Sequence, residues 1–159
     1  MALDPSFVGR KGGRSRIVIE RSAVANFARA IKDANPVFAD PRAAEAAGLD
    51  GIAVPPTFLI AATVWGKHPE IQPDDDGGPN PQGEVVAEYA RQGGLLLHGE
   101  QGFTYERPLK VGDVLDTETE VVDTYTKGSM TFCVVETRYT DAETGELVAT
   151  ARNNFINKQ

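Results

Sequence analysis

Residues 33–38, Asp-Ala-Asn-Pro-Val-Phe, place a carboxylate and a carboxamide together where a helix is expected to end. Pro36 disfavours helical backbone at Asn35, so the helix ends near residue 33 or 34 and the chain enters a loop. Asp33 would be able to transfer protons if a second acid-base group lay beside it. Phe38, at the sixth position of the segment, cannot be that group. The segment is therefore either catalytically inactive or depends on an acid-base residue from another part of the structure.

His98 is a second candidate for proton transfer. The pattern from residue 95 onward has a period of two and predicts a strand. One face would carry Leu97, Gly99, Gln101, Phe103 and Tyr105, and the other His98, Glu100, Thr104 and Glu106. A His98–Glu100 pair on one face could supply a base, although an ordinary hydrogen-bonded histidine is the simpler interpretation. Gln101 would face the interior and either meet a ligand or make a core hydrogen bond.

Simpler roles are also expected for the other reactive side chains. Asp33 and Asn35 are residue types that cap turns by accepting local N–H groups. Cys133 lies mid-strand without an activating base near it in sequence, so a small core residue is favoured over a nucleophile.

The elements that would position these residues begin with a short strand and three helices. A short strand is predicted at 16–20, then a helix with Ser22 as N-cap and an apolar stripe made of Val24, Phe27, Ala28 and Ile31. Asp40 and Pro41 predict the cap and first residue of a second helix, which Gly48 would stop. A third helix is predicted over 55–65, ending at residue 66. It is apolar almost all round, as in helices enclosed by protein.

The second half of the chain predicts an antiparallel meander. Residues 67–83 read as an exposed loop and 84–93 as a short helix. Strands follow from 95, at 114–125, at 130–140 and at 147–156, joined by short turns. An apolar helix beside a curled antiparallel sheet indicates an α+β hot-dog fold, and layer rules favour it over a doubly wound fold. We expect one domain over residues 1–159.

Composition narrows the class of protein. At 159 residues, with 41% hydrophobic and 25% charged residues, the chain fits a soluble globule. The net charge of -7 argues against a nucleic-acid partner, because phosphates need a basic face, and weakly against an anionic membrane. The single cysteine excludes an intrachain disulfide and favours a reducing compartment.

Other sequence features favour the cytoplasm. The first residues lack the basic-then-apolar layout of a secretory signal. The chain has no apolar run of the roughly 18–20 residues that a bilayer-spanning helix needs. With two histidines and one cysteine, the sequence predicts no zinc site, and neither a metal nor a cofactor is expected.

Several segments in order resemble the MaoC-like (R)-specific enoyl-CoA hydratases. Residues 33–38 resemble that family's D-x-N-P-x-H motif, and Asp40 with 43–48 resembles the overhang that follows it. Residues 54–58, Val-Pro-Pro-Thr-Phe, resemble the start of its central helix. Residues 103–113 resemble its F-x-x-P-V-x-x-G-D strand and turn. The resemblance covers roughly residues 15–156, and the order and spacing of the segments carry it.

Two features are more similar to one branch of that family. Residues 98–101, His-Gly-Glu-Gln, and the Pro-Pro-Thr-Phe helix start resemble the N-terminal MaoC-type dehydratases. That branch includes subunits of actinobacterial 3-hydroxyacyl-ACP dehydratases. The resemblance implies a subunit of a 3-hydroxyacyl-thioester dehydratase or (R)-specific enoyl-CoA hydratase in fatty-acyl metabolism. Its substrate would be an acyl-CoA or acyl-ACP thioester. Arg107 and Lys110 would then be either ion-pair partners or contacts for a pantetheine phosphate.

The resemblance also implies roles for single residues. In that family the motif Asp and His activate a water, and an N–H at the central helix's start donates to the thioester oxygen. Here the His position is Phe38 and the donor position aligns with Pro56, which has no N–H. A shift of the alignment by one residue would make Thr57 the donor.

We therefore expect the chain's own half-site to be inactive and to shape an acyl tunnel. Asn35, Phe38, Thr57 and Gln101 would contact the substrate, and Asp33 and His98 are the candidate catalytic residues. The assembly would be a homodimer, or a heterodimer with a catalytic hydratase-like subunit.

Other functions stay open at this point. One is a free-standing hydratase that uses Asp33 with His98, and another is a non-enzymatic acyl-thioester binding module. A hot-dog thioesterase is a further option, but such sites usually place an acidic residue on the central helix, and residues 57–66 contain none.

Overall fold

The structure, a computed structural model, describes residues 3–64 and 78–159. Its strands are β1 (Ser15–Val18), β2 (Leu95–Tyr105), β3 (Val114–Lys127), β4 (Met130–Asp141) and β5 (Leu147–Lys158). Its helices are α1 (Arg21–Ala30), α2 (Pro41–Ala46), α3 (Phe58–Val64) and α4 (Pro81–Gln92), with short 3-10 helices η1 (Pro5–Phe7) and η2 (Pro36–Phe38).

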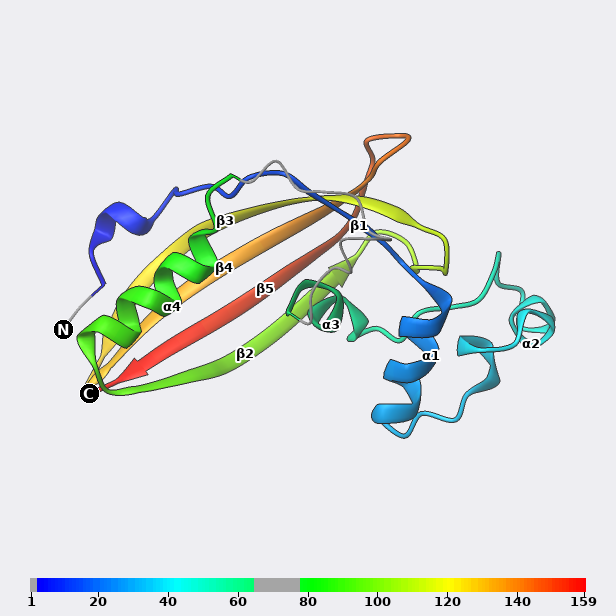
Figure 1. Cartoon of the computed structure of the whole chain (residues 1–159), viewed down its shortest axis with the longest axis horizontal. Helices are drawn as coiled ribbons and strands as arrows, with labels where there is room; N and C mark the ends of the chain where they lie inside the picture. Colours follow the sequence, from blue (N-terminus) through cyan, green and yellow to red (C-terminus); the bar gives the residue numbers. More distant parts are fainter. Residues whose placement is uncertain (1–2, 65–77) are drawn as a thin grey trace.

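One antiparallel sheet of five strands organises the molecule (Figure 1). The strand order is β1-β3-β4-β5-β2, so β2 is an edge strand. Tight turns with a positive-φ glycine, Gly128 after β3 and Gly145 after β4, join the long strands as a meander. The predicted α+β hot-dog fold is confirmed, with helices on the inner face of a curled sheet.

The helices cover the inner face in two places. Toward one end, α3 and α1 pack on the sheet in a first cluster that includes Val24, Phe58, Leu59 and Ala151. Toward the other end, α4 buries Val85 and Tyr89 against Cys133, Val135 and Phe155 in a second cluster. Figure 1 shows α3 and α4 separated along the sheet, with α1 and α2 beyond the end where α3 lies.

A β-bulge at Gly99 changes which residues of β2 share a face. His98 pairs with Phe155 and Glu100 pairs with Asn154, so the register shifts between them. Neighbouring residues of β5 point to opposite faces. His98 and Glu100 therefore lie on opposite faces, and the predicted pair is wrong. The physical reason is the extra residue of the bulge, which reverses the alternation.

Beyond the bulge, the predicted alternation is correct. Gln101, Phe103 and Tyr105 pair with the inner residues Asn153, Ala151 and Ala149. The bulge places His98 on this inner face too, while Leu97 and Gly99 lie on the outer face.

The start of the first helix differs from the prediction. Helix α1 begins at Arg21 with Glu20 as N-cap, so the assignment of this role to Ser22 is wrong. The helix also ends at Ala30, earlier than predicted, because Lys32 adopts a positive φ of 59°. Ile31 therefore lies outside the helix and is 47% exposed.

The later helices follow their capping residues. Asp40 caps α2 by accepting from the Arg42 N–H, as predicted. Helix α3 begins at Phe58, and the prediction of its end at 65–66 lies outside the described residues. Helix α4 begins three residues earlier than predicted, because Asn80 caps it and Pro81 occupies its first position. No described helix is long and apolar enough to cross a membrane.

Candidate functional site

Asp33 and Asn35 use their side chains to fold their own loop. The Asn35 N–H donates to Asp33 Oδ1 at 3.0 Å, and the Val37 N–H donates to Asn35 Oδ1 at 3.2 Å. Asn35 is thereby the N-cap of η2. Both residues are exposed. The structure thus contains the local capping expected for these residue types.

Phe38, the last residue of the 33–38 segment, is buried. Only 9% of its surface is exposed. Contacts with α1 and α2 hold η2 in place, and the Ala53 N–H donates to the Val37 carbonyl at 3.0 Å. The ring therefore lies on the packed side of this loop.

The entry to α3 contains two prolines. The Tyr105 hydroxyl donates to the Pro56 carbonyl at 2.5 Å, tying the helix entry to β2. Burial raises the pKa of Tyr105 to about 12. Pro56 has no N–H, and Thr57 is exposed and supplies the first N–H after the prolines.

His98 lies far from the motif loop. It is the fourth residue of β2 and stacks on Phe155, with ring centroids 5.5 Å apart. Figure 1 shows β2 beginning beside the end of α4, at the end of the sheet remote from α1, α2 and the loop between them. The structure therefore does not bring Asp33 and His98 together within this chain.

Gln101 and Asn153 face each other across β2 and β5 on the inner face. Asn153 is 7% exposed, and Gln101 is half-buried. Within the described residues, neither Asn153 Oδ1 nor Gln101 Oε1 has a hydrogen-bond donor. The Gln101 amide group donates only long bonds, to the carbonyls of Gly102 at 3.4 Å and Arg152 at 3.5 Å.

Asn153 was not a candidate in the sequence. A signal was nevertheless present, because Asn153 occupies an inward position between Ala151 and Phe155, where the pattern calls for an apolar residue.

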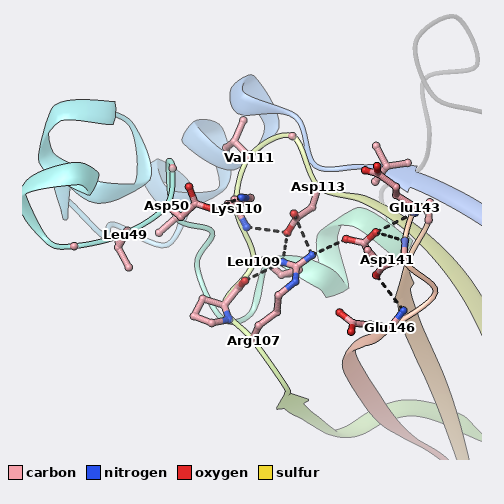
Figure 2. Close-up of a pocket in the computed structure, with 18 residues that line it drawn as sticks. Leu49, Asp50, Arg107, Leu109, Lys110, Val111, Asp113, Asp141, Glu143 and Glu146 are labelled. Carbon is pink, nitrogen blue, oxygen red and sulfur yellow. Dashed lines mark hydrogen bonds and ion pairs between the residues drawn. The ribbon is translucent and has the colours of Figure 1, made fainter.

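A cavity of about 930 Å³ lies where the loop after α2 meets the β2–β3 and β4–β5 connections (Figure 2). Arg107 spans it: its guanidinium donates to Asp113 at 2.8 and 3.2 Å and to Asp141 at 3.0 Å. Lys110 forms an ion pair with Asp50. Ion pairing is one of the two roles that the sequence left open for Arg107 and Lys110.

The charged residues that line this cavity disfavour the binding of a phosphate group. Its lining includes two basic residues and five acidic ones, Asp50, Asp113, Asp141, Glu143 and Glu146. The hydrogen bond from Arg107 to Asp113 is the main cause that raises the pKa of Arg107. Backbone N–H groups of Thr144 and Glu143, and then Arg107, lower the pKa of Asp141. Both basic side chains of the cavity are therefore already paired with carboxylates.

Cys133 is a core residue. It is fully buried beneath α4, and burial raises the pKa of its thiol to about 12. A thiol that stays protonated is a poor nucleophile, so the predicted core role is confirmed. Among residues 3–64 and 78–159, no three His, Cys, Asp or Glu side chains are grouped so as to hold a metal ion.

Known proteins share this fold. The described chain is similar to the HadBC (3R-hydroxyacyl-ACP dehydratase) complex of Mycobacterium tuberculosis, with a TM-score of 0.71 and 21% identity, over 99% of this chain and 100% of that chain. It is also similar to the ChsH1-ChsH2 complex of the same organism, with a TM-score of 0.73 and 22% identity, over 93% and 84% of the two chains. A MaoC-like dehydratase gives a TM-score of 0.76 at 23% identity, over 97% of this chain and 43% of that chain.

Sequence relatives cover nearly the whole chain. The UPF0336 protein of Saccharopolyspora erythraea is 34% identical over 157 residues, which is 98% of this chain and 92% of that protein. The UPF0336 protein of Streptomyces avermitilis is 36% identical over 158 residues, 98% and 95% of the two chains. A model of the FAS1-like dehydratase domain region matches residues 6–151. On this match, with relatives of such identity along its whole length, the chain belongs to the FAS1-like dehydratase-region family.

Proposed function

We propose that this chain is the acyl-binding subunit of a cytoplasmic 3-hydroxyacyl-thioester dehydratase or (R)-specific enoyl-CoA hydratase. A hydratase-like partner subunit supplies the acid-base pair and the oxyanion donor. The substrate is an acyl-CoA or acyl-ACP thioester of fatty-acyl metabolism, and this chain forms one wall of its tunnel. The observation that carries the proposal is Phe38, a buried aromatic ring at the motif position of the proton-transfer histidine.

The entry to α3 supports the same division of labour. Pro56 stands where the donor of the thioester oxygen is expected and has no N–H. Loss of an acid-base group typically lowers a rate by a factor of about 10²–10⁴, and loss of an oxyanion donor by about 10²–10³. With Phe38 and Pro56 at these two positions, both contributions are assigned to the partner. Asn35, Phe38, Thr57 and Gln101 of this chain contact the acyl thioester.

The edge strand β2 offers a surface for the partner. It has eleven residues and pairs with β5 on one side. Leu95, Leu96 and Leu97 are 56%, 37% and 38% exposed along it. An edge strand with exposed leucines is a template for pairing with another chain. HadBC and ChsH1-ChsH2, two of the similar structures, are both complexes of subunits.

Activity with and without a partner tests this proposal. Crotonyl-CoA hydration is measured with the purified chain alone, and again after coexpression with a hydratase-like protein that carries an intact D-x-N-P-x-H motif. We expect turnover only with the partner, and no loss of that turnover in the Asp33→Asn variant of this chain. Brisk turnover by the chain alone, abolished by Asp33→Asn or His98→Ala, would overturn the proposal. Tight acyl-CoA binding without turnover in either state would instead indicate a binding module.

A gain-of-function variant sharpens the test. Phe38→His restores the imidazole, and Pro56→Gly restores the backbone donor. We expect either change alone to leave hydration near background, because each repairs one part of the mechanism. The hydration rate of the double variant should exceed that of either single variant by about ten-fold or more, since the two contributions act on the same transition state. Equal activity in all three variants would contradict the assigned positions.

A further inference from the structure

Four polar side chains lie on the inner face of the sheet, near the boundary between its two apolar clusters. On β5, Asn153 lies between Ala151 of the first cluster and Phe155 of the second. On β2, Gln101 lies beside it. On the β3 and β4 side, the Thr119 and Thr137 hydroxyls bond to each other at 3.0 Å. The two threonines satisfy one another, whereas the two amide side chains do not.

The two amide oxygens are unpaired in a buried place. Within the part of the chain that the structure describes, Asn153 Oδ1 and Gln101 Oε1 have no donor, although each atom is shielded from solvent. Leaving a buried polar group unpaired is unfavourable, because the group loses its hydrogen bonds to water without gaining a partner. Directly opposite residues of an antiparallel pair have Cβ atoms about 5 Å apart. Both oxygens can therefore accept hydrogen bonds from one small ligand group.

The surroundings select a neutral group. Glu136 and Glu100, the closest carboxylates in register, pair with Arg152 and Asn154, so they project to the outer face. The inner positions beside the amides are Val135, Phe103 and Ala151. An oxygen acceptor in such a setting favours a neutral O–H or N–H donor over an ion.

We propose that Asn153 and Gln101 form a recognition site for a neutral hydrogen-bond donor of the acyl-thioester substrate. The donor is either the 3-hydroxyl of the acyl chain or an amide N–H of pantetheine. This inference rests on the proposed function and adds a specificity-determining residue, Asn153, to it. A ligand is favoured over a partner subunit as the occupant, because β5 is flanked by β4 and β2. A strand added at the β2 edge would reach Gln101 but would not contact Asn153.

Binding to the coexpressed complex tests the site. Calorimetric titrations use 3-hydroxybutyryl-CoA, butyryl-CoA and free CoA, which differ in the hydroxyl and the acyl chain and share the pantetheine amides. The variants are Asn153→Leu and Gln101→Met, which keep size and remove the amide. Asn154→Leu is the matched control, because Asn154 Oδ1 also has no donor among the described residues but lies on the outer face, where the side-chain N–H donates to the Tyr125 hydroxyl.

We expect the dissociation constant to rise about ten-fold in Asn153→Leu and in Gln101→Met, which corresponds to the loss of one hydrogen bond. The control should bind as the wild type does. An effect confined to 3-hydroxybutyryl-CoA identifies the hydroxyl as the donor, and an equal effect on all three probes identifies pantetheine. The melting temperature of Asn153→Leu should be unchanged or higher, because an unpaired buried amide is replaced by an apolar group.

Other outcomes would overturn the site. Unchanged affinity in both variants would remove it while leaving the proposed function intact. The same holds if the variants weaken subunit association alone, which would assign the amides to the partner. A lower melting temperature for Asn153→Leu would show that the amide is paired within the folded core. If the wild-type complex bound none of the three probes, the proposed function with a CoA thioester as substrate would fail, and the site with it.

Discussion

The Tyr105 hydroxyl donates a hydrogen bond of 2.5 Å to the Pro56 carbonyl, joining the last residue of β2 to the entry of α3. Pro56 is exposed, but the phenol ring packs on the first core cluster. Through this bond, the edge strand that we assign to the partner interface also positions the helix entry that faces the proposed substrate.

Replacing this tyrosine should weaken the helix entry. Tyr105→Phe is expected to lower the free energy of unfolding by about 1 kcal/mol, the usual contribution of one hydrogen bond. Chemical denaturation measures the change. Tyr125→Phe is the matched control, because that tyrosine is 42% exposed and its hydroxyl makes only a 3.4 Å bond. An equal loss of stability in both variants would contradict the role of the Pro56 bond.

Tyr105 also predicts how stability changes in alkali. Burial raises its pKa from 10.0 to about 12 in the folded state, so the folded protein keeps this proton at a pH where the unfolded chain loses it. The stability from this group is therefore complete below pH 10 and decreases as the pH rises toward 12. Across that pH range, the free energy of unfolding should decrease less steeply with pH in Tyr105→Phe than in the wild type. The same pH dependence of the free energy of unfolding in both proteins would show that Tyr105 does not contribute to it.

The bulge at Gly99 should tolerate no side chain while Ile156 keeps its position. A Cβ at Gly99 would lie 2.9 Å from Ile156 Cγ1 and would also overlap Cδ1. Gly99→Ala is expected to destabilise the fold by about 1–3 kcal/mol, as in other overpacked sites. Ile156→Ala should remove most of that penalty in the double variant, which a double-mutant cycle measures. Strictly additive effects would show that backbone strain, rather than this contact, limits the position.

Charge on the edge strand should disrupt assembly. Leu97→Lys places an ammonium among the exposed leucines of β2, where pairing with a second strand would bury it. Sedimentation at micromolar concentration is expected to show a dimer for the wild type and mainly monomer for the variant. Val8→Lys changes another exposed apolar residue, 46% exposed and outside β2, and should stay dimeric. A wild type that sediments only as a monomer would contradict the pairing.

The Arg107 network should stabilise the fold more than the neighbouring Lys110 pair. Arg107→Ala leaves the Asp113 carboxylate, whose side chain is 4% exposed, without its guanidinium. We expect a loss of about 1–2 kcal/mol, less than for a fully buried pair because Arg107 is partly exposed. Lys110→Ala removes a pair with Asp50, which is 95% exposed, and should change stability little.

The same network predicts an acid dependence. The pKa of Asp141 is held below its ordinary value of 3.8, first by the N–H groups of Thr144 and Glu143 and then by Arg107. Its ionised form therefore contributes stability above that pH, and the contribution is lost as the pH falls through the lower folded pKa. The difference in stability between the wild type and Arg107→Ala should narrow in acid. A constant difference from neutral to acid pH would count against the ion pair.

The features that the sequence alone determined are those made by residues a few positions apart. Asp40 caps α2, and Asn35 caps η2, because each side chain bonds an N–H two residues away. Phe38 cannot transfer a proton in any fold, because its side chain carries no titratable group. The long strands and their glycine turns were also readable, since alternation and turn chemistry are properties of short segments.

Tertiary structure decided everything that depends on register between distant strands. The bulge at Gly99 separates His98 from Glu100, although their spacing in sequence matched a shared face. Gln101 and Asn153 are 52 positions apart, and only the pairing of β2 with β5 makes them neighbours. Sequence periodicity specifies which residues alternate between the two faces of a strand. A single extra residue in one strand reverses that alternation, and the position of the extra residue depends on packing against the partner strand.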